Sequence, residues 1–589
     1  MKQFFKFTFA AMLGFFLSLF VLTVVFFIFT FAIISTIDTE ETVTVKSNSL
    51  LEIKLDFELP ERSSKEPNLN FGEIPSFEKS LGLNDLLKSI SSARNDRNIS
   101  GIFLDLDNFI SPGISKLTEI RNSLLDFKKS KKLIIAHGNT ISEGAYYLAS
   151  VADSIYLTPT GNMEFDGFGI ELTFFKKTLD KLDIKPQIFQ HGKYKSATEP
   201  FRVEKMSEDN RVQLNKFLSS IYDKIISQIS ASTKISTQDL KNISSELKIN
   251  SAEDAEKYGL ITNLKYEDEV DSILAKLINK STEDEVEKIS FKKYSKSLGG
   301  QEASSENRIA VIYASGEITN GEGDESSIGT ENIIKSLEEA NENKRVKAIV
   351  LRVNSPGGSA LTSDMIWRKI KLIKSEKPII VSMSDLAASG GYYISCAANK
   401  IVAESTTLTG SIGVFGIIPN AQKFFDEKLG ITFDEVSTSE NSGWATITNP
   451  LNEVQKKYIQ NQIEEIYVDF VSRIAEGRQM SFEQVDSIGQ GRIWSGINAK
   501  EIGLVDTLGG IKLALDIASE SAGIKDYKIL EYPTQKETFE KIMEMFSSKV
   551  EIGFGKFLFS EQLNQIEKLS KAMKYQGIQT RLPFEFEIK

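Results

Sequence analysis

Two side chains that could form a nucleophile–base pair lie in different halves of this 589-residue sequence. Ser411 stands between glycines in the polar segment STTLTGSIGVFG (405–416), and Lys195 lies in HGKYKSATEPF (191–201). A serine hydroxyl is a weak nucleophile until a neighbouring base takes its proton, and a neutral lysine amine is one such base. These residue types therefore favour attack of a serine on an acyl carbon.

Histidine and cysteine are almost absent, which restricts the alternatives. The chain has two histidines, His137 and His191, and one cysteine, Cys396, which core packing explains. One cysteine excludes an intrachain disulfide and a cysteine-rich metal site, so we expect no metal and no cofactor. A serine paired with His191 stays open as a minor alternative. The net charge of −11, without a compensating basic segment, argues against a nucleic-acid partner.

The two candidate residues belong to two copies of one unit. GIFLDLDNFISPG (101–113) resembles AIVLRVNSPGG (348–358), and SEGAYYLASVADSIYL (142–157) resembles ASGGYYISCAANKIVA (388–403). Two shorter matches follow in the same order, and all four keep an offset of 244 to 247 residues. Chance similarity would not hold this spacing, so the sequence indicates a tandem duplication.

The copies differ where the chemistry would lie. The first-copy position that corresponds to Ser411 is Phe165, and the second-copy position that corresponds to Lys195 is Asn441. A residue that only one copy has is not required by the shared fold. We therefore predict one composite site, in which burial between the two domains lowers the lysine pKa from its usual value of about 10.4.

Several neighbours compete for these roles. Ser389, in an Ala-Ser-Gly-Gly turn at the start of a predicted helix, is a rival nucleophile, and Lys193 is a rival base. Lys193 and Lys205 are most simply solvated surface lysines. Ser355 and Ser359 have the positions of a turn residue and a helix N-cap.

The elements that must position these residues follow a β-α-β pattern in the second copy. Apolar runs predict strands, and amphipathic stretches predict helices between them, which indicates a largely parallel sheet. The predicted strands are 308–314, 346–353, 377–384 and 400–404, and the predicted helices are 359–375 and 390–399. Glycine turns follow two of these strands, and their backbone N–H groups suit an anion. Gly357 and Gly358 are therefore oxyanion candidates, and Ser389 and Gly390 belong to the second of these turns.

The N-terminus predicts attachment to a membrane. Residues 7–34 form an uncharged run of 28 residues, longer than the roughly 20 that a membrane-spanning helix needs. Its length favours an uncleaved anchor over a cleaved signal peptide. The flanking charges predict a cytoplasmic N-terminus and an exported body, with Lys2 and Lys6 before the run and Asp38, Glu40 and Glu41 after it.

Taken together, TGSIGVFG with Ser411, SPGG at 355–358, ASGGYYIS at 388–395 and YKSATEPF with Lys195 resemble the signal peptide peptidase A (protease IV) family, in its long duplicated form. The resemblance implies a ClpP/crotonase-like fold and a Ser–Lys dyad, with Ser411 as nucleophile and Lys195 as base. It leaves Ser389 and Gly390 as residues that line the site. It further implies apolar signal peptides as substrates, a homotetramer, and a location in the bacterial inner membrane with the catalytic body on the periplasmic side.

The resulting α/β organisation has five predicted parts. They are an anchor over 1–45, a first ClpP/crotonase-like domain over 46–290, a linker over 291–304, a second such domain over 305–535 and a tail over 536–589. In the tail, a stripe at helical spacing predicts an amphipathic helix, and packing is favoured over membrane contact. The stripe comprises Phe539, Ile542, Met543 and Phe546.

Two other functions remain open at this point. A membrane-anchored scaffold or chaperone could keep the peptidase fold without catalysis. Acyl-CoA chemistry of the crotonase type is disfavoured, because the body is predicted to be exported and no basic phosphate patch is present.

Overall fold

The computed structural model describes residues 2–37, 43–68, 76–278, 280, 286–299, 305–535 and 578–581. The N-terminal run forms one helix, α1 (Lys2–Ile37), as predicted. Its segment Lys6–Val25 has a mean hydropathy of 2.3 and is long and apolar enough to cross a membrane. A membrane anchor and a signal sequence share these properties.

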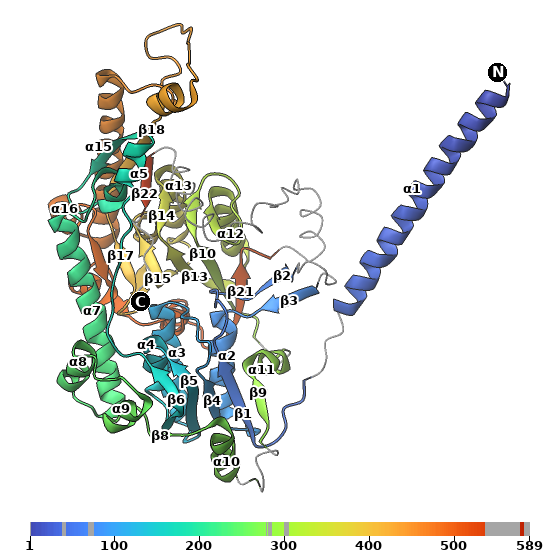
Figure 1. Cartoon of the computed structure of the whole chain (residues 1–589), viewed down its shortest axis with the longest axis vertical. Coiled ribbons are helices and arrows are strands. Elements are labelled where there is room, and N and C mark those ends of the chain that lie inside the picture. The colour runs from blue at the N-terminus through green and yellow to red at the C-terminus, as the bar shows by residue number, and fades with distance from the viewer. Residues whose placement is uncertain are drawn as a thin grey trace.

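Each copy forms a largely parallel sheet covered by helices, with the first sheet at the bottom of Figure 1 and the second above it; strand β19 (Ile493–Ser495) pairs antiparallel at the edge of the second sheet. The first sheet has the order β8 (Asn263–Leu264), β6 (Ser154–Met163), β5 (Leu133–Ile141), β4 (Ile99–Asp105), β1 (Ser49–Lys54) and β9 (Lys288–Ser290). Its main helices are α2 (Leu83–Asn95), α3 (Ile114–Lys128), α4 (Glu143–Ala149) and α7 (Glu208–Thr233).

The second sheet repeats this arrangement and confirms the predicted strands. Its order is β19 (Ile493–Ser495), β17 (Leu408–Gly410), β15 (Ile379–Ala388), β13 (Val346–Ser355), β10 (Arg308–Ser315) and β21 (Lys528–Tyr532), with β16 (Lys400–Ala403) beside β15 and β20 (Thr507–Leu508) beside β16. The central strands are apolar on both faces because helices cover both sides of the sheet. These helices include α12 (Thr330–Glu342), α13 (Ala360–Ile373), α14 (Gly390–Ser395), α15 (Glu453–Arg478) and α18 (Ile511–Ser521).

A third sheet joins the two copies. Its order is β12 (Ser327–Gly329), β11 (Glu317–Thr319), β14 (Gly357–Ser359), β22 (Ile578–Arg581), β18 (Val414–Asn420) and β7 (Lys185–His191). Strand β7 comes from the first copy, and β22 comes from near the C-terminus. Figure 1 shows β14, β22 and β18 together above the second sheet.

The chain between and beyond the two copies is only partly described. The stretch predicted as the linker begins with α11 (Phe291–Ser297), in which Phe291 and Tyr294 are buried. The predicted stripe in the C-terminal tail lies outside the described residues. The domain boundaries stay predictions.

A buried cation holds the two copies together. Arg352 on β13 is fully buried and donates from Nε to Glu61 Oε2 (2.8 Å) and from Nη2 to Glu119 Oε1 (2.6 Å). Both carboxylates belong to the first copy. Although burial opposes ionisation of Glu61, Arg352 and the nearby Lys116 hold its pKa below the usual value.

Replacing Arg352 by Met is expected to lower the midpoint of thermal unfolding substantially. The change leaves two buried carboxylates without their cation, a loss of roughly 3–5 kcal/mol for a broken buried ion pair. The control is Arg345→Met, because the ion pair of Arg345 with Glu306 is exposed and such pairs contribute little. Equal midpoints for the two variants would contradict a structural role of Arg352.

Candidate active site

Two parallel strands bring Ser389 and Ser411 side by side. Strands β15 and β17 pair in parallel, and their last residues, Ala388 and Gly410, lie opposite each other. Ser389 directly follows β15, and Ser411 directly follows β17. Neighbouring strands lie about 4.8 Å apart, so their next residues are adjacent. The structure thus brings together the predicted nucleophile and its rival.

Both serines have an unusual backbone conformation. The φ angle is 55° at Ser389 and 49° at Ser411, in the left-handed region that residues other than glycine rarely adopt. Backbone hydrogen bonds hold them there, from Ser389 N to Gly410 O (2.8 Å) and from Ser411 N to Arg492 O (2.7 Å). Such strain concentrates at functional sites, where the surrounding structure over-determines the conformation.

Pairing between the copies brings Lys195 to these serines. Strand β7 runs antiparallel to β18, from Lys185 opposite Asn420 to His191 opposite Val414. Lys195 follows the last residue of β7 closely, and Ser411 precedes the first residue of β18 closely. The same end of one strand pair therefore carries the amine of the first copy and the hydroxyl of the second.

The amine of Lys195 lies at the centre of a small polar cluster. Its Nζ is 2.9 Å from Ser389 Oγ, 3.1 Å from Ser411 Oγ and 3.2 Å from the Ser411 carbonyl oxygen. All three residues are buried, with Lys195 only 1% exposed. The ring of Phe415 lies 5.9 Å away.

No carboxylate forms an ion pair with Lys195 among the described residues. Burial therefore acts on the amine without compensation and lowers its pKa well below the ordinary lysine value. Because its pKa is lowered, Lys195 becomes available as a proton acceptor at a lower pH than a surface lysine does. The protein interior therefore disfavours the protonated, positively charged form of Lys195.

Close backbone contacts fix the turn that carries Lys195. Tyr194 N donates to Gln490 O (2.9 Å), and Gln213 of α7 donates to Tyr194 O (3.0 Å). A Cβ at Gly491 would lie 2.5 Å from Lys195 N, too close for any side chain. Gly491 and Gln213 were not identified from the sequence, because their contribution depends on contacts across the two copies.

The glycine turn beside the serines is partly bonded already. The N–H of Gly357 donates to Ser355 Oγ (3.1 Å), and Gly358 lies in β14. A Cβ at Gly357 would come within 3.0 Å of Gly390 N and Ala388 O, so this turn lies against the start of α14. Gly357, Gly358 and Gly390 are thus close to Ser389, while their roles stay predictions.

An extended segment of the chain lies directly beside this turn. Strand β22 runs antiparallel to both β14 and β18, with Gly358 opposite Thr580 and Phe415 opposite Gln579. Thr580 is fully buried, and its hydroxyl donates to Gly358 O (3.1 Å). The gap between these two strands therefore accepts a polypeptide backbone.

The rival residues lie elsewhere. Lys193 is exposed and forms an ion pair with Asp209, and Lys205 is exposed. The ring of His191 stacks on Tyr467 and contacts Glu464.

The remaining alternatives have structural contacts of their own. The Ser355 hydroxyl donates to Gly316 O (2.6 Å) and accepts from Gly357 N. Ser359 caps α13, and Cys396 is buried in the second core. Among the described residues, no group of three or more potential ligands could hold a metal ion.

Comparison with known proteins gives consistent matches over the chain. The profile of peptidase family S49 matches residues 126–281 and 371–525, and that of Clp protease matches residues 300–408. Protease 4 of Haemophilus influenzae is 36% identical over 462 residues, which are 77% of this chain and 74% of that protein. Protease 4 of Salmonella typhi is 36% identical (79% and 76% covered), and the chloroplastic serine protease SPPA of Arabidopsis thaliana is 33% identical (76% and 67% covered).

Replacing Gly491 by Ala is expected to slow covalent labelling of Ser411 by a fluorophosphonate about 100-fold, since displacement of a catalytic group by about 1 Å has this effect. The new Cβ must push the backbone of Lys195 away. Gly523→Ala is the matched control, because Gly523 also has a positive φ (65°) but has no atom within 4 Å of the added Cβ. If both variants label alike, the close contact does not position Lys195.

Proposed function

We propose that this chain, which belongs to peptidase family S49 and is a serine peptidase, cleaves apolar peptides with Ser411 as nucleophile and Lys195 as general base. The observation that carries the assignment is the buried amine of Lys195, 3.1 Å from the Ser411 hydroxyl and without an ion-pair partner among the described residues. The same pair is supported by the comparison of the copies, because the first copy lacks the serine and the second copy lacks the lysine.

The contacts of Lys195 suit a neutral amine. A neutral amine has two N–H donors and one lone pair. Donation to Ser389 Oγ and to the Ser411 carbonyl oxygen uses both donors and leaves the lone pair for the Ser411 hydroxyl. Ser389 is then a positioning residue for the amine, although its own hydroxyl lies 2.9 Å from Nζ.

The reaction follows from this arrangement. Ser411 Oγ attacks the substrate carbonyl carbon as its proton passes to Lys195 Nζ. The C–N bond then breaks, and Lys195 returns the proton to the leaving amine. Water, deprotonated by Lys195, hydrolyses the resulting ester and regenerates Ser411. Backbone N–H groups of Gly357 and Gly358 are proposed to stabilise the oxyanion, for which Gly357 must release Ser355 Oγ.

The substrate is proposed to bind as an added strand. Strand β22 occupies the gap between β14 and β18, beside the glycine turn, and an incoming peptide in the same place would form the same main-chain hydrogen bonds. Signal peptides released at the membrane fit this site, because α1 would anchor the body near them. We further propose a cytoplasmic N-terminus, a periplasmic body and a homotetramer, all from the family resemblance.

The dyad is tested by substitution and labelling. Ser411→Ala is expected to abolish fluorophosphonate labelling and peptide cleavage, and Lys195→Ala to slow both by about 10²–10⁴-fold, the usual contribution of a general base. Lys193→Ala is the control, because this exposed lysine pairs with Asp209. Labelling that survives in Ser411→Ala but is lost in Ser389→Ala would transfer the nucleophile to Ser389, and no labelling of the parent protein would favour a non-catalytic scaffold.

The labelling rate of Ser411 is expected to rise with pH and to level off well below the ordinary lysine pKa of 10.5. Burial lowers the pKa of Lys195, so the amine loses its proton early, and only the neutral form accepts the serine proton. At pH values below this depressed pKa, Lys195 is protonated and the rate falls. A rate that climbs until about pH 10.5 would show an unshifted amine.

A further inference from the structure

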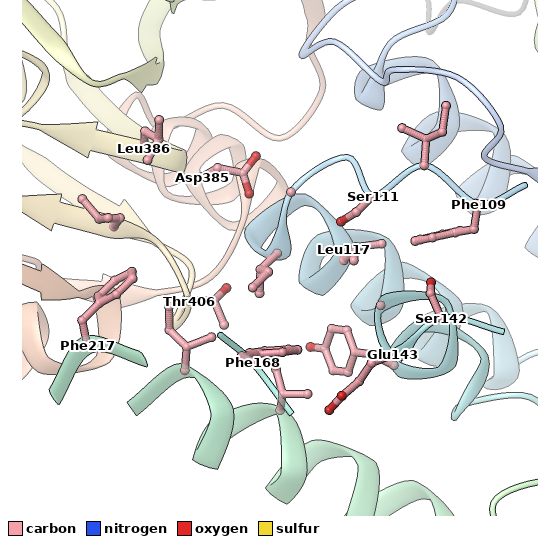
Figure 2. Close-up of a pocket in the computed structure, with 18 of the residues that line it drawn as sticks. Phe109, Ser111, Leu117, Ser142, Glu143, Phe168, Phe217, Asp385, Leu386 and Thr406 are labelled. Carbon is pink, nitrogen blue, oxygen red and sulfur yellow. The ribbon is translucent and has the colours of Figure 1, made fainter. Parts of the chain in front are cut away.

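A cavity of about 880 Å³ lies between the two copies, apart from the Lys195 cluster. Figure 2 shows Phe109, Ser111 and Ser142 of the first copy on one side, and Asp385 and Leu386 of the second copy on the other. Helix α7 lies below the cavity in this view and lines it with Phe217, Ile221 and Ile225. The volume falls within the range of about 300–1,000 Å³ typical of ligand sites.

The cavity lies where the first copy would have its own active site. It opens at the carboxyl ends of β4, β5 and β6, the edge of a parallel sheet where ligands bind. By the repeat offset, Glu143 corresponds to Ser389 and Phe165 to Ser411, and the turn at Gly113 corresponds to that at Gly357. The first copy thus has no serine at either of these positions, but the cavity beside them is present.

The anion-binding turn of the first copy is already filled. Asp385 of the second copy accepts from Ser115 N (2.8 Å) at the start of α3, and its carboxylate occupies the place of a Cβ at Gly113. Lys116 Nζ lies 3.7 Å from the same carboxylate. Because these donors are occupied, this site is not built to stabilise an oxyanion.

The rest of the cavity lining suits an apolar ligand that carries a few polar groups. The lining is mainly apolar, with Phe109, Leu117 and Phe168 among its walls. Glu143 Oε2 accepts from Gly167 N (2.8 Å), whereas the buried Oε1 has no partner among the described residues. Glu143 is 7% exposed, and burial raises the pKa of its carboxyl to about 7. A protonated Glu143 can donate to a peptide carbonyl.

The cavity adjoins the proposed peptide-binding groove, which is the gap between β14 and β18 that β22 occupies. Pro356, which directly precedes Gly357, lines the cavity, and so does Arg581 at the end of β22. Arg581 stands opposite Gly357 in the strand ladder. A peptide that follows the path of β22 therefore leads from the groove to the mouth of this cavity.

We propose that this cavity is a non-catalytic subsite that holds an apolar segment of the same peptide that Ser411 cleaves. This inference rests on the proposed function for the identity of the peptide. Asp385 is engaged by Ser115 N and Lys116, and Glu143 serves as a donor, which leaves Glu164 and Asp166 as the acidic lining residues that can attract a cation. The preferred segment therefore has a basic residue at its flank.

The test uses binding to Ser411→Ala protein, which does not depend on turnover. The probe is a dye-labelled peptide with an apolar core and a flanking lysine, and anisotropy gives its Kd. Gly144→Trp fills the cavity, because the nearest atoms to the added Cβ belong to the lining residues Phe109, Leu117 and Ser111, at 3.5, 3.7 and 4.0 Å, all in ordinary van der Waals contact. We expect a roughly tenfold rise in Kd. Phe109→Gln, which removes one apolar wall, serves as a second variant if Gly144→Trp does not fold.

Two further measurements make the result decisive. Leu125→Gln, on the same helix as Leu117 but outside the cavity lining, is the control and keeps the parent Kd. In the active enzyme, Gly144→Trp raises KM for the long peptide relative to that for a tripeptide ester. An unchanged Kd in the folded cavity variants overturns the subsite. Absence of Ser411 labelling overturns the proposed function instead, and leaves the binding result interpretable.

Discussion

The antiparallel pairing of β7 with β18 is the constraint on which the active site depends. It is a contact between the two copies, and it places the end of a first-copy strand beside the start of a second-copy strand. Lys195 and Ser411 lie just beyond that end of the ladder, so the position of the amine follows from strand register. The chain itself brings these groups together. It needs a correct register over seven paired residues.

The same contact creates the environment that the chemistry needs. Lys195 is buried because the turn at Gly491 closes over its backbone and the serine turns close over its amine. Among the described residues no carboxylate pairs with this amine, and a charged amine in such a place is unfavourable for stability. The ion pairs of Arg352 with Glu61 and Glu119 join the two copies at another part of the same interface. Function and stability are thus divided between neighbouring parts of one interface.

The sequence was sufficient for the fold class, the family and the candidate pair. Apolar runs located β10, β13, β15 and β16, and the repeat offset located the residues that differ between copies. The resemblance to signal peptide peptidase A and the two-copy α/β fold are confirmed by the family matches. The third sheet could not be predicted, because β7 and β18 pair across more than 220 residues and neither strand has a local signal for its partner. The position of Asp385 in the Gly113 turn could not be predicted from the sequence either, because only tertiary packing brings these residues together.

The pairing of β7 with β18 also determines how the two reactive groups come together during folding. Because β7 and β18 belong to one polypeptide, the amine and the hydroxyl meet at an effective concentration set by the intervening chain. Formation of the proposed dyad is therefore a unimolecular folding step, whose equilibrium does not shift on dilution. Gene duplication followed by fusion converts what would be an encounter between two subunits into a property of one translation product. It also fixes the ratio of the two half-sites at one to one.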